Sequence, residues 1–230
     1  MKPYYQNDKT IVYACDFREI IDTLSGDMLV VTDPPYNINF KYDQYIDSVP
    51  EDEYIKTISM LNKFSKIIIC HYPIETMKYI VPALGVPDAV SAWCYNANIP
   101  NRFRLISYYG CKPDYSKVKQ PYKNPDDKRV AKYINGDNDG TNLYEWWSDI
   151  QLVKNVSEEK NLHPCPVPEK LQSRLIKLCG NKDDVIFDPF CGGLTTLKAA
   201  QDLGYKSVGC EISKNYIDSG LERLFQLRFA

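Results

Sequence analysis

The sequence of 230 residues lacks the features that mark several protein classes. It has only two histidines and no C-x-x-C pair among its eight cysteines, so zinc spacing is absent and we expect no metal. No stretch approaches the ~18 uninterrupted apolar residues of a membrane helix, and the N-terminus has no apolar core for a signal peptide. These absences predict a cytoplasmic protein with free thiols and no membrane contact.

The chain also lacks a strong net charge. Its formal charge is −2, so binding to nucleic acid would need a local basic patch. Hydrophobic residues make up 44% of the chain, which is enough for one sizeable core. Short apolar runs alternate with stretches of helical spacing, and this alternation predicts an α/β protein with a doubly wound, mostly parallel sheet.

The expected elements follow from these two periodicities. Strands are predicted at residues 11–14, 28–31, 66–70, 89–95, 104–110, 184–188 and 207–210. Helices are predicted after Asp16, before Gly180, after Leu194, and at residues 50–64, 73–84 and 213–228.

Residues 32–37 read Thr-Asp-Pro-Pro-Tyr-Asn and follow a buried strand. The two prolines have no backbone N–H, so the loop presents acceptors, namely the Asp33 carboxylate and the Pro34 carbonyl. Two such acceptors suit an amine with two hydrogens, and Tyr36 adds a flat face for a planar heterocycle. A plain turn in which Asp33 caps a loop is the alternative.

Residues 184–196 form a second stretch, a buried strand that runs through a glycine-rich turn into a helix. Gly192 and Gly193 have no Cβ and would let the backbone approach a ligand closely. The next strand ends at Glu211, about twenty positions on, where a carboxylate can accept both ribose hydroxyls. A generic nucleotide-binding unit is the alternative.

Together the two stretches resemble the DNA amino-methyltransferases, which methylate the exocyclic amine of adenine or cytosine. The catalytic stretch precedes the cofactor stretch, as in the permuted β group of that family. The resemblance implies a Rossmann-like class I methyltransferase fold in which the Asp33 and Asp188 strand ends lie side by side. It further implies S-adenosyl-L-methionine as cofactor and four catalytic residues, Asp33, Pro34, Pro35 and Tyr36.

The same resemblance implies a set of cofactor-binding residues: Asp16, His163, Asp188, Phe190, Gly192, Gly193, Thr195 and Glu211. A helix cap at Asp16 and simple packing by His163 are the alternatives. Three positions depart from the family pattern. Leu194 stands where a glycine is usual, so its Cβ is expected to narrow the cofactor channel. Pro166 and Val167 stand where Gln and Lys are expected, which removes two polar contacts.

Residues 112–133 lack periodicity and carry seven basic side chains against three acidic ones, interleaved with tyrosines. Such a surface can follow phosphates and stack on bases, whereas a solvated insertion is the alternative. The predicted DNA-binding residues are Asn37, Lys112, Lys117, Lys119, Lys123, Lys128 and Arg129.

The chain is expected to be one domain, residues 1–230, in three parts. A catalytic half spans residues 1–111 and a cofactor-binding half spans residues 143–230. Residues 112–142 occupy the place of a short inserted target-recognition segment. Residues 38–47 are expected to form a mobile loop where a lid over a flipped base would lie, with a solvated connector as the alternative.

These patterns predict transfer of a methyl group to N6 of adenine in double-stranded DNA, after base flipping, in a restriction-modification setting. Adenine is preferred over cytosine because Asp rather than Ser begins the family's tetrapeptide. Cytosine-N4 methylation stays open, as do RNA or protein amine methylation, a non-catalytic DNA-binding or cofactor-binding relative, and a homodimer.

Overall fold

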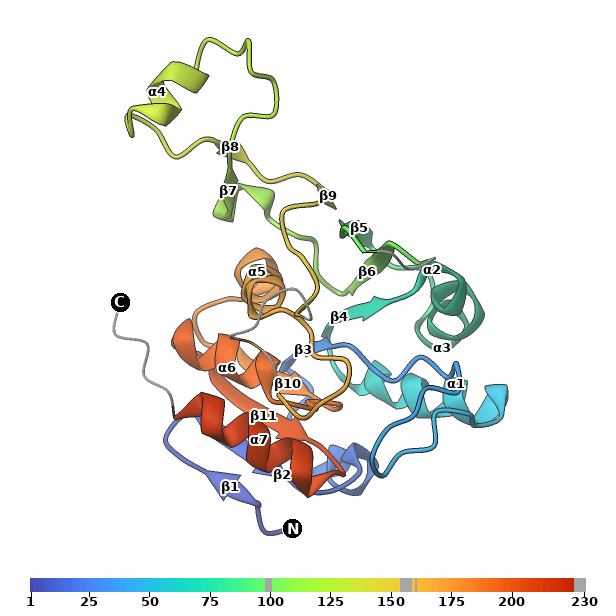
Figure 1. Ribbon diagram of the computed structural model, residues 1–230. Coiled ribbons are helices and arrows are strands. Elements are labelled where there is room, and N and C mark those ends of the chain that lie inside the picture. The colour runs from blue at the N-terminus through green and yellow to red at the C-terminus, as the bar shows by residue number, and fades with distance from the viewer. Residues whose placement is uncertain (98–100, 154–158, 160, 226–230) are drawn as a thin grey trace.

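The structure is a computed structural model that describes residues 1–97, 101–153, 159 and 161–225. These residues form a nine-stranded sheet in the order β1-β2-β11-β10-β3-β4-β6-β5-β9 (Figure 1). Its strands are β1 (Tyr5–Gln6), β2 (Thr10–Tyr13), β3 (Leu29–Thr32), β4 (Lys66–His71), β5 (Ala89–Cys94), β6 (Phe103–Tyr109), β9 (Trp146–Trp147), β10 (Val185–Asp188) and β11 (Lys206–Cys210).

Most neighbours in this sheet are parallel, as predicted. The five strands β2, β11, β10, β3 and β4 all run in one direction. The antiparallel strands are β1, beside β2, and β6, between β4 and β5. Because β10 pairs directly with β3, the strand ends that carry Asp188 and Asp33 lie side by side, and this prediction is confirmed.

Helices cover both faces of the sheet (Figure 1). One face carries α5 (Glu169–Cys179), α6 (Thr195–Asp202) and α7 (Lys214–Leu224), and the other carries α1 (Glu51–Ser59) and α3 (Val81–Leu84). Successive β3 residues point to opposite faces. Val31 therefore packs with Leu175 of α5, whereas Val30 packs with Ile58 of α1. This double cover explains why all of β3 is buried.

The prediction of a helix after Asp16 is wrong. The chain forms two 3-10 turns there, η1 (Phe17–Glu19) and η2 (Ile21–Thr23), because Ile20 leaves helical geometry at φ −122°. Asp16 caps η1 by accepting the backbone N–H of Arg18 at 2.9 Å, so the capping alternative describes its local role.

The other predicted helices are present with altered ends. The 50–64 helix is α1 followed by a 3-10 turn, η3 (Met60–Lys63), and the 73–84 helix consists of α2 (Pro73–Glu75), a π turn, η4 (Thr76–Ile80), and α3. The last helix, α7, ends at Leu224, and the predicted continuation to residue 228 extends outside the described residues.

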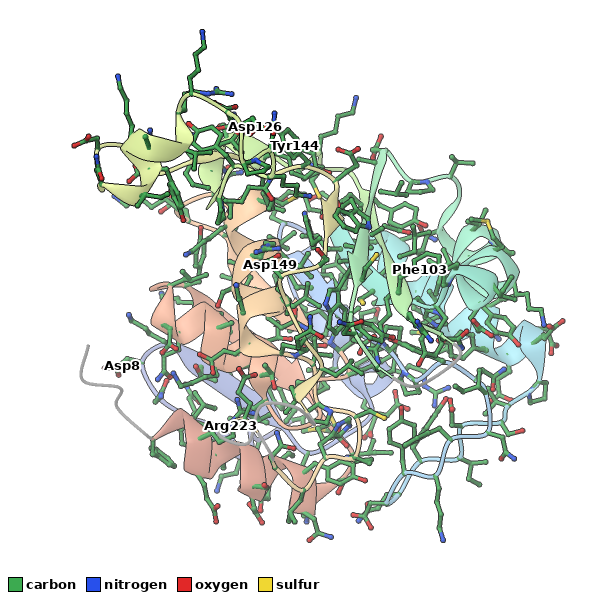
Figure 2. All side chains as sticks on the ribbon, turned by 45° about the horizontal axis from the view of Figure 1, so that its top comes forward. Asp8, Phe103, Asp126, Tyr144, Asp149 and Arg223 are labelled. Carbon is green, nitrogen blue, oxygen red and sulfur yellow. The ribbon has the colours of Figure 1, made fainter. Side chains whose placement is uncertain are left out.

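Residues 112–142, called the arm below, project beyond the β9 edge of the sheet (Figures 1 and 2). The arm contains η5 (Tyr115–Lys117), the two-stranded sheet of β7 (Lys119–Gln120) and β8 (Thr141–Asn142), and α4 (Val130–Ile134). The arm follows β6, which runs antiparallel to β4, so the arm starts beside the first residues of β4. Its first residues are fixed to the end of α5, where the Asp114 N–H donates to the Leu178 carbonyl at 2.9 Å.

Candidate active site

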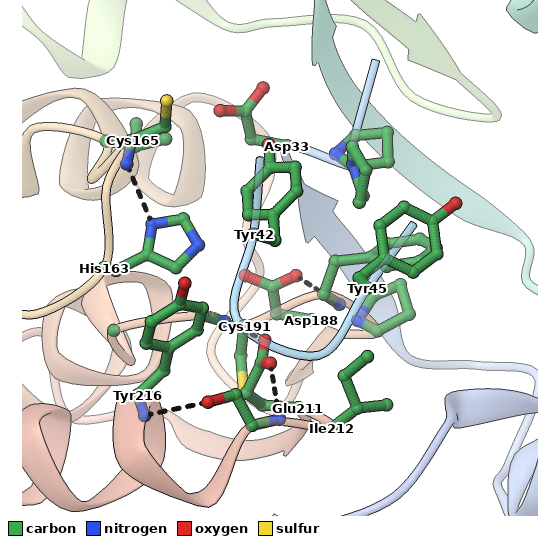
Figure 3. Close-up of a pocket in the computed structure, with 18 of the residues that line it drawn as sticks. Asp33, Tyr42, Tyr45, His163, Cys165, Asp188, Cys191, Glu211, Ile212 and Tyr216 are labelled. Atoms are coloured by element: carbon green, nitrogen blue, oxygen red, sulfur yellow. Dashed lines mark hydrogen bonds between the residues drawn. The ribbon is translucent and has the colours of Figure 1, made fainter. Parts of the chain in front are cut away.

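One pocket lies where the parallel strands end (Figure 3). The ends of β2, β3, β10 and β11 each bring a carboxylate to its lining: Asp16, Asp33, Asp188 and Glu211. The two stretches that are about 150 residues apart in sequence therefore form a single cleft, which is where open α/β sheets place their ligands.

Glu211 lies at the cofactor end of this pocket. Its carboxylate accepts the Gly192 N–H at 3.0 Å and the Ser213 N–H at 2.8 Å, so the side chain is fixed by the backbone on both sides (Figure 3). Burial raises the pKa of Glu211, and these N–H groups oppose the rise. Each oxygen keeps a second lone pair that can accept a hydrogen bond from a hydroxyl group of a ligand.

Asp188 ties the two strand ends together. It accepts the Thr32 hydroxyl at 2.7 Å and the Phe190 N–H at 3.1 Å, and only 3% of the residue is exposed. Burial raises the pKa of Asp188 to about 6 because its partners are neutral donors rather than a cation.

His163 forms one wall of the pocket against the glycine turn. A Cβ at Gly192 would lie 2.9 Å from the imidazole, and Gly192 adopts φ +46°, which also favours glycine. A Cβ at Gly193 would lie 2.6 Å from the Asn161 side chain. The glycines are thus required by the packing of residues 161–163. Burial lowers the pKa of His163 to about 4, so its imidazole is neutral at pH 7.

The expectation that Leu194 narrows the cofactor channel is wrong. Leu194 adopts the left-handed conformation at φ 61°, which turns its fully buried side chain into a cluster with Ile217 and Leu224. It does not belong to the pocket lining. Pro166 and Val167 do line the pocket, and they give that wall an apolar character.

The remaining predicted cofactor residues also line the pocket. Both carboxylate oxygens of Asp16 bind the Arg18 guanidinium, at 2.9 and 2.7 Å. Phe190 packs edge-on against Phe17 with 5.2 Å between ring centroids. Thr195 is buried at the start of α6. Their roles in cofactor binding stay predictions.

Asp33 is held by two donors at the other end of the pocket. Tyr36 donates its hydroxyl to one carboxylate oxygen, and the Arg104 guanidinium binds the other at 3.0 Å. Burial raises the pKa of Asp33, whereas Arg104 and Tyr36 oppose that rise. In Figure 3 the Asp33 carboxylate points away from Asp188 and Glu211, so the pocket has two chemically distinct ends.

The open aromatic face expected of Tyr36 is not present in this structure. The ring packs against His71 with 4.3 Å between centroids and against Tyr72 at 4.7 Å, and only 7% of Tyr36 is exposed. Tyr54 fixes the loop at Pro35: its hydroxyl donates to the Pro35 carbonyl and contacts His71 Nε2 at 3.2 Å. Tyr36 nevertheless lines the pocket, and its stacking on a base stays a prediction.

Residues 38–47 lie over the pocket, where a lid was expected. The buried Asp47 carboxylate accepts three backbone N–H groups of the loop, and Asn37 closes it with two hydrogen bonds to Val49. The loop also reaches α7, since the Ser213 hydroxyl donates to Asp43 at 2.7 Å. Phe40, Tyr42 and Tyr45 line the pocket from this loop. Mobility of the loop and DNA contact by Asn37 stay predictions.

No arm residue lines the pocket. Several of its basic side chains bind the protein itself. Lys117 donates to the Gly180 carbonyl at 3.2 Å, Lys119 binds the Asn142 side chain, and Arg129 pairs with Asp127 at 2.8 Å. DNA contact by the arm therefore stays a prediction, including that by Lys112, Lys123 and Lys128.

Sequence reasoning missed several pocket residues, above all Arg104 and Tyr72. Arg104 occupies a buried position of β6 between Leu105 and the exposed Phe103. An arginine on the inward face of an apolar strand was the available signal, since a buried charge requires a partner.

Two absences apply to the described part of the chain. Its helices are all too short or too polar to cross a membrane. Within the same residues, no group of three or more His, Cys, Asp or Glu side chains is arranged to hold a metal ion.

Comparison with known proteins identifies the family. The family model described as DNA methylase matches residues 62–222. Type II methyltransferase M.ScaI of Streptomyces caespitosus is 26% identical and matches over 97% of this chain and 84% of its own. DNA adenine methyltransferase YhdJ of Escherichia coli (strain K12) is 26% identical, with coverage of 94% of this chain and 82% of its own.

Solved structures show the same fold. The PvuII DNA methyltransferase (cytosine-N4-specific) superimposes with a TM-score of 0.71 at 15% identity, covering 100% of this chain and 91% of that one. The M1.HpyAVI–SAM complex gives 0.63 at 20% identity, with coverage of 94% and 99%. The chain therefore belongs to the DNA methylase family and is a DNA amino-methyltransferase, adenine-N6 or cytosine-N4 specific, with a Rossmann-like fold and S-adenosyl-L-methionine as cofactor.

Proposed function

We propose that this protein methylates N6 of adenine in double-stranded DNA. The observation that carries the proposal is the Asp33 carboxylate, held by Arg104 and Tyr36 in the same cleft as Glu211. An aspartate at the head of the tetrapeptide favours adenine within the family, and one relative is named as a DNA adenine methyltransferase. The relatives named as Type II methyltransferases support a restriction-modification role for this protein.

The side chains at the cofactor end fit S-adenosyl-L-methionine, which supplies a sulfonium methyl group when it is bound. Glu211 would accept the ribose hydroxyls, since its oxygens are fixed by Gly192 and Ser213 with lone pairs to spare. Phe190 would pack against the adenine ring of the cofactor. The apolar Pro166 and Val167 exclude water from this wall of the pocket.

The catalytic loop would act on a base that has been flipped out of the duplex, because the amine is otherwise buried in the stack. Asp33 and the Pro34 carbonyl accept the two amine hydrogens, which draws the nitrogen lone pair out of ring conjugation. As the new N–C bond forms, the methyl–sulfur bond would break and leave its electron pair on sulfur, and Asp33 would take the proton that the nitrogen loses. Positioning and fixed dipoles provide the acceleration, and no covalent enzyme intermediate forms.

Product analysis tests the choice of base. The protein is incubated with DNA and methyl-labelled S-adenosyl-L-methionine, and the DNA is digested to nucleosides for mass spectrometry. We expect the label in N6-methyladenine nucleoside, with none in RNA or protein substrates offered in parallel. Label confined to N4-methylcytosine, or no label at all, would refute the proposal.

Cytosine-N4 methylation is the second candidate. The structural similarity to the cytosine-N4-specific PvuII enzyme, which covers the whole chain, favours it. The same two acceptors would bind a cytosine amine. The nucleoside analysis distinguishes the two products in one experiment, and a homodimer is tested separately by light scattering of the purified protein.

A further inference from the structure

Arg104 is a buried cation in an aromatic cage beside the catalytic loop. Its guanidinium carbon lies 5.2 to 5.5 Å from the ring centroids of Tyr36, Tyr72 and Trp93, and the residue is 8% exposed. It binds Asp33 at 3.0 Å. Its Nε is buried with no hydrogen-bond partner among the described residues.

Stability of the sheet does not account for a guanidinium at this position. Removing a charge pair from water costs several kcal/mol per ion, and well-packed apolar residues often stabilise such positions equally well or better. The neighbouring buried positions of β6, such as Ile106, are apolar and pack into the core. The placement of Arg104 is therefore best explained by what it does to Asp33.

We propose that Arg104 is a positioning residue that keeps Asp33 ionised and directs its carboxylate as an acceptor for the target amine. This inference rests on the proposed function, in which Asp33 accepts an amine hydrogen. A protonated Asp33 would present an O–H donor in place of an acceptor oxygen and could not take a proton from the amine, so it would bind the amine more weakly. The rate of methyl transfer should then follow the ionised fraction of Asp33.

The other groups that face Asp33 cannot replace this cation. Asp188 on β10 is itself acidic, and its charge disfavours an ionised Asp33. Among the described residues, the remaining titratable neighbours lie on the same loop, on α1, on β4 and in the 161–168 segment. They are acids that burial keeps neutral: Tyr36, Tyr42, Tyr54, Cys70 and Cys165. Neutral Tyr36 donates one hydrogen bond to Asp33, so the opposite charge comes from Arg104.

Single-turnover methyl transfer with saturating DNA and cofactor tests the inference between pH 6 and 9. Arg104→Met removes the charge and is expected to move the acid limb of the rate profile up by at least about one pH unit. We expect it to be several-fold slower than wild type at pH 6.5 and to recover as the pH rises. Arg104→Lys keeps the charge and should keep the limb near its wild-type position.

Two controls separate the outcomes. Binding of S-adenosyl-L-methionine by calorimetry shows whether each variant is folded. If neither neutral variant, Arg104→Met nor Arg104→Gln, is folded, the ¹³C carboxyl shift of Asp33 in the wild-type protein decides. A midpoint below pH 6 supports the inference, and a midpoint at or above pH 6 overturns it.

Failure of this inference differs from failure of the proposed function. An Asp33→Asn variant that still methylates DNA would show that Asp33 is not the acceptor, so the catalytic role of Asp33 fails, whereas the absence of N6-methyladenine in the nucleoside analysis would refute the proposed function. An inactive Asp33→Asn variant together with an Arg104→Met profile that matches wild type would overturn the role of Arg104 alone.

Discussion

At the scale of single residues, two neighbouring carboxylates differ because their partners differ. Asp33 faces a guanidinium, whereas Asp188 receives hydrogen bonds from the neutral Thr32 hydroxyl and the Phe190 N–H. An opposite charge favours the ionised form far more than a neutral donor does. Asp33 is therefore suited to accept from an amine, and Asp188 to hold two strand ends together.

The pKa of Asp188 predicts how stability depends on pH. Its folded pKa of about 6 lies above the unfolded value of 3.8, so the folded protein binds more protons between these pH values. Its contribution to the free energy of unfolding therefore falls as the pH rises through that window. At pH 7, the free energy of unfolding of Asp188→Asn should be about 1–3 kcal/mol higher than that of wild type. Urea unfolding at pH 7 and 4 tests this, since the difference should vanish at pH 4.

Glu211 should control cofactor affinity. Glu211→Ala removes the predicted ribose acceptor and leaves the Gly192 and Ser213 N–H groups without their carboxylate. We expect the dissociation constant of S-adenosyl-L-methionine in calorimetry to rise by at least about ten-fold. The matched control is Glu222→Ala, an exposed change on α7, which should leave it unchanged. Equal binding by both variants would remove Glu211 from the cofactor site.

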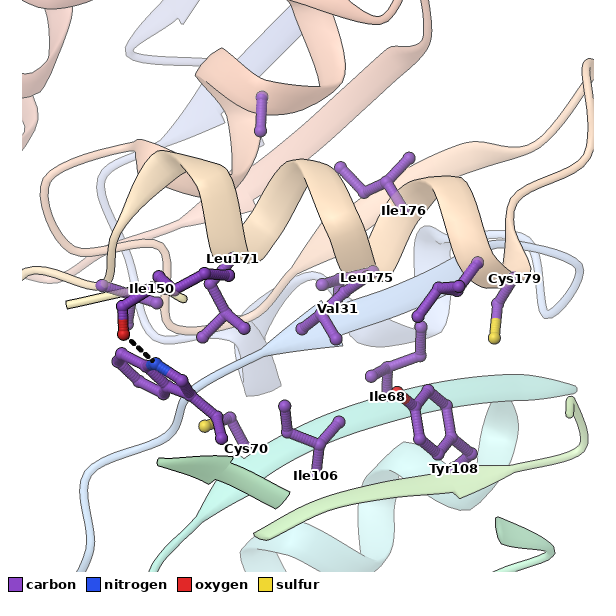
Figure 4. Packing of buried hydrophobic residues seen from close by; sticks show 14 of the residues in the cluster. Val31, Ile68, Cys70, Ile106, Tyr108, Ile150, Leu171, Leu175, Ile176 and Cys179 are labelled. Carbon is purple, nitrogen blue, oxygen red and sulfur yellow. Dashed lines mark hydrogen bonds between the residues drawn. The ribbon is translucent and has the colours of Figure 1, made fainter. Parts of the chain in front are cut away.

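At the scale of elements, α5 fixes the strands that carry the site (Figure 4). Leu175 is 1% exposed and packs into the cluster that contains Val31 of β3 and Ile68 of β4. Leu175→Ala should lower the free energy of unfolding by about 2–5 kcal/mol, because it leaves a cavity under the catalytic strand. Lys177→Ala, on the exposed side of α5, is the control and should change it by less than about 0.5 kcal/mol. Similar denaturation midpoints for both would contradict this packing.

Elements differ in how far local sequence determines them. The strand ends that carry Asp33 and Glu211 were predictable, since short apolar runs and the turns after them are local signals. The 3-10 turns η1 and η2 were not predictable, because the apolar spacing of Phe17 and Ile21 fits an α-helix as well as it fits two 3-10 turns. The direction of the Leu194 side chain also depends on a left-handed φ that apolar periodicity does not reveal.

At the scale of the whole molecule, the site depends on strand pairing that local patterns do not encode. Arg104 reaches Asp33 only because β6 inserts antiparallel between β4 and β5. The aromatic cage likewise joins Tyr36, Tyr72 and Trp93 from three separate segments. A sequence predicts that a cleft exists between β3 and β10, but not which distant side chains complete it.

The arm should bind the DNA backbone rather than the cofactor. Replacing Lys123, Lys128 and Arg129 by alanine should weaken DNA binding across sequences. The slope of log affinity against log salt should fall by roughly 0.9 for each phosphate that the arm no longer neutralises. Fluorescence anisotropy at several salt concentrations measures both the affinity and the slope.

The matched control replaces three exposed lysines near the amino ends of β2, β10 and β11, namely Lys9, Lys182 and Lys206. Affinity for S-adenosyl-L-methionine should be unchanged in both triple variants. An arm variant with the wild-type salt slope would show that the arm does not bind phosphates.

The most direct measurement is single-turnover methyl transfer to DNA by Asp33→Asn, with cofactor binding measured on the same preparation. Asparagine keeps the shape of the side chain but replaces an acceptor oxygen with an NH₂ donor. We predict that the variant binds S-adenosyl-L-methionine like wild type and transfers methyl groups at least about a hundred-fold more slowly. A variant that binds the cofactor and methylates DNA at the wild-type rate would contradict the assignment of Asp33 and of the cleft between β3 and β10.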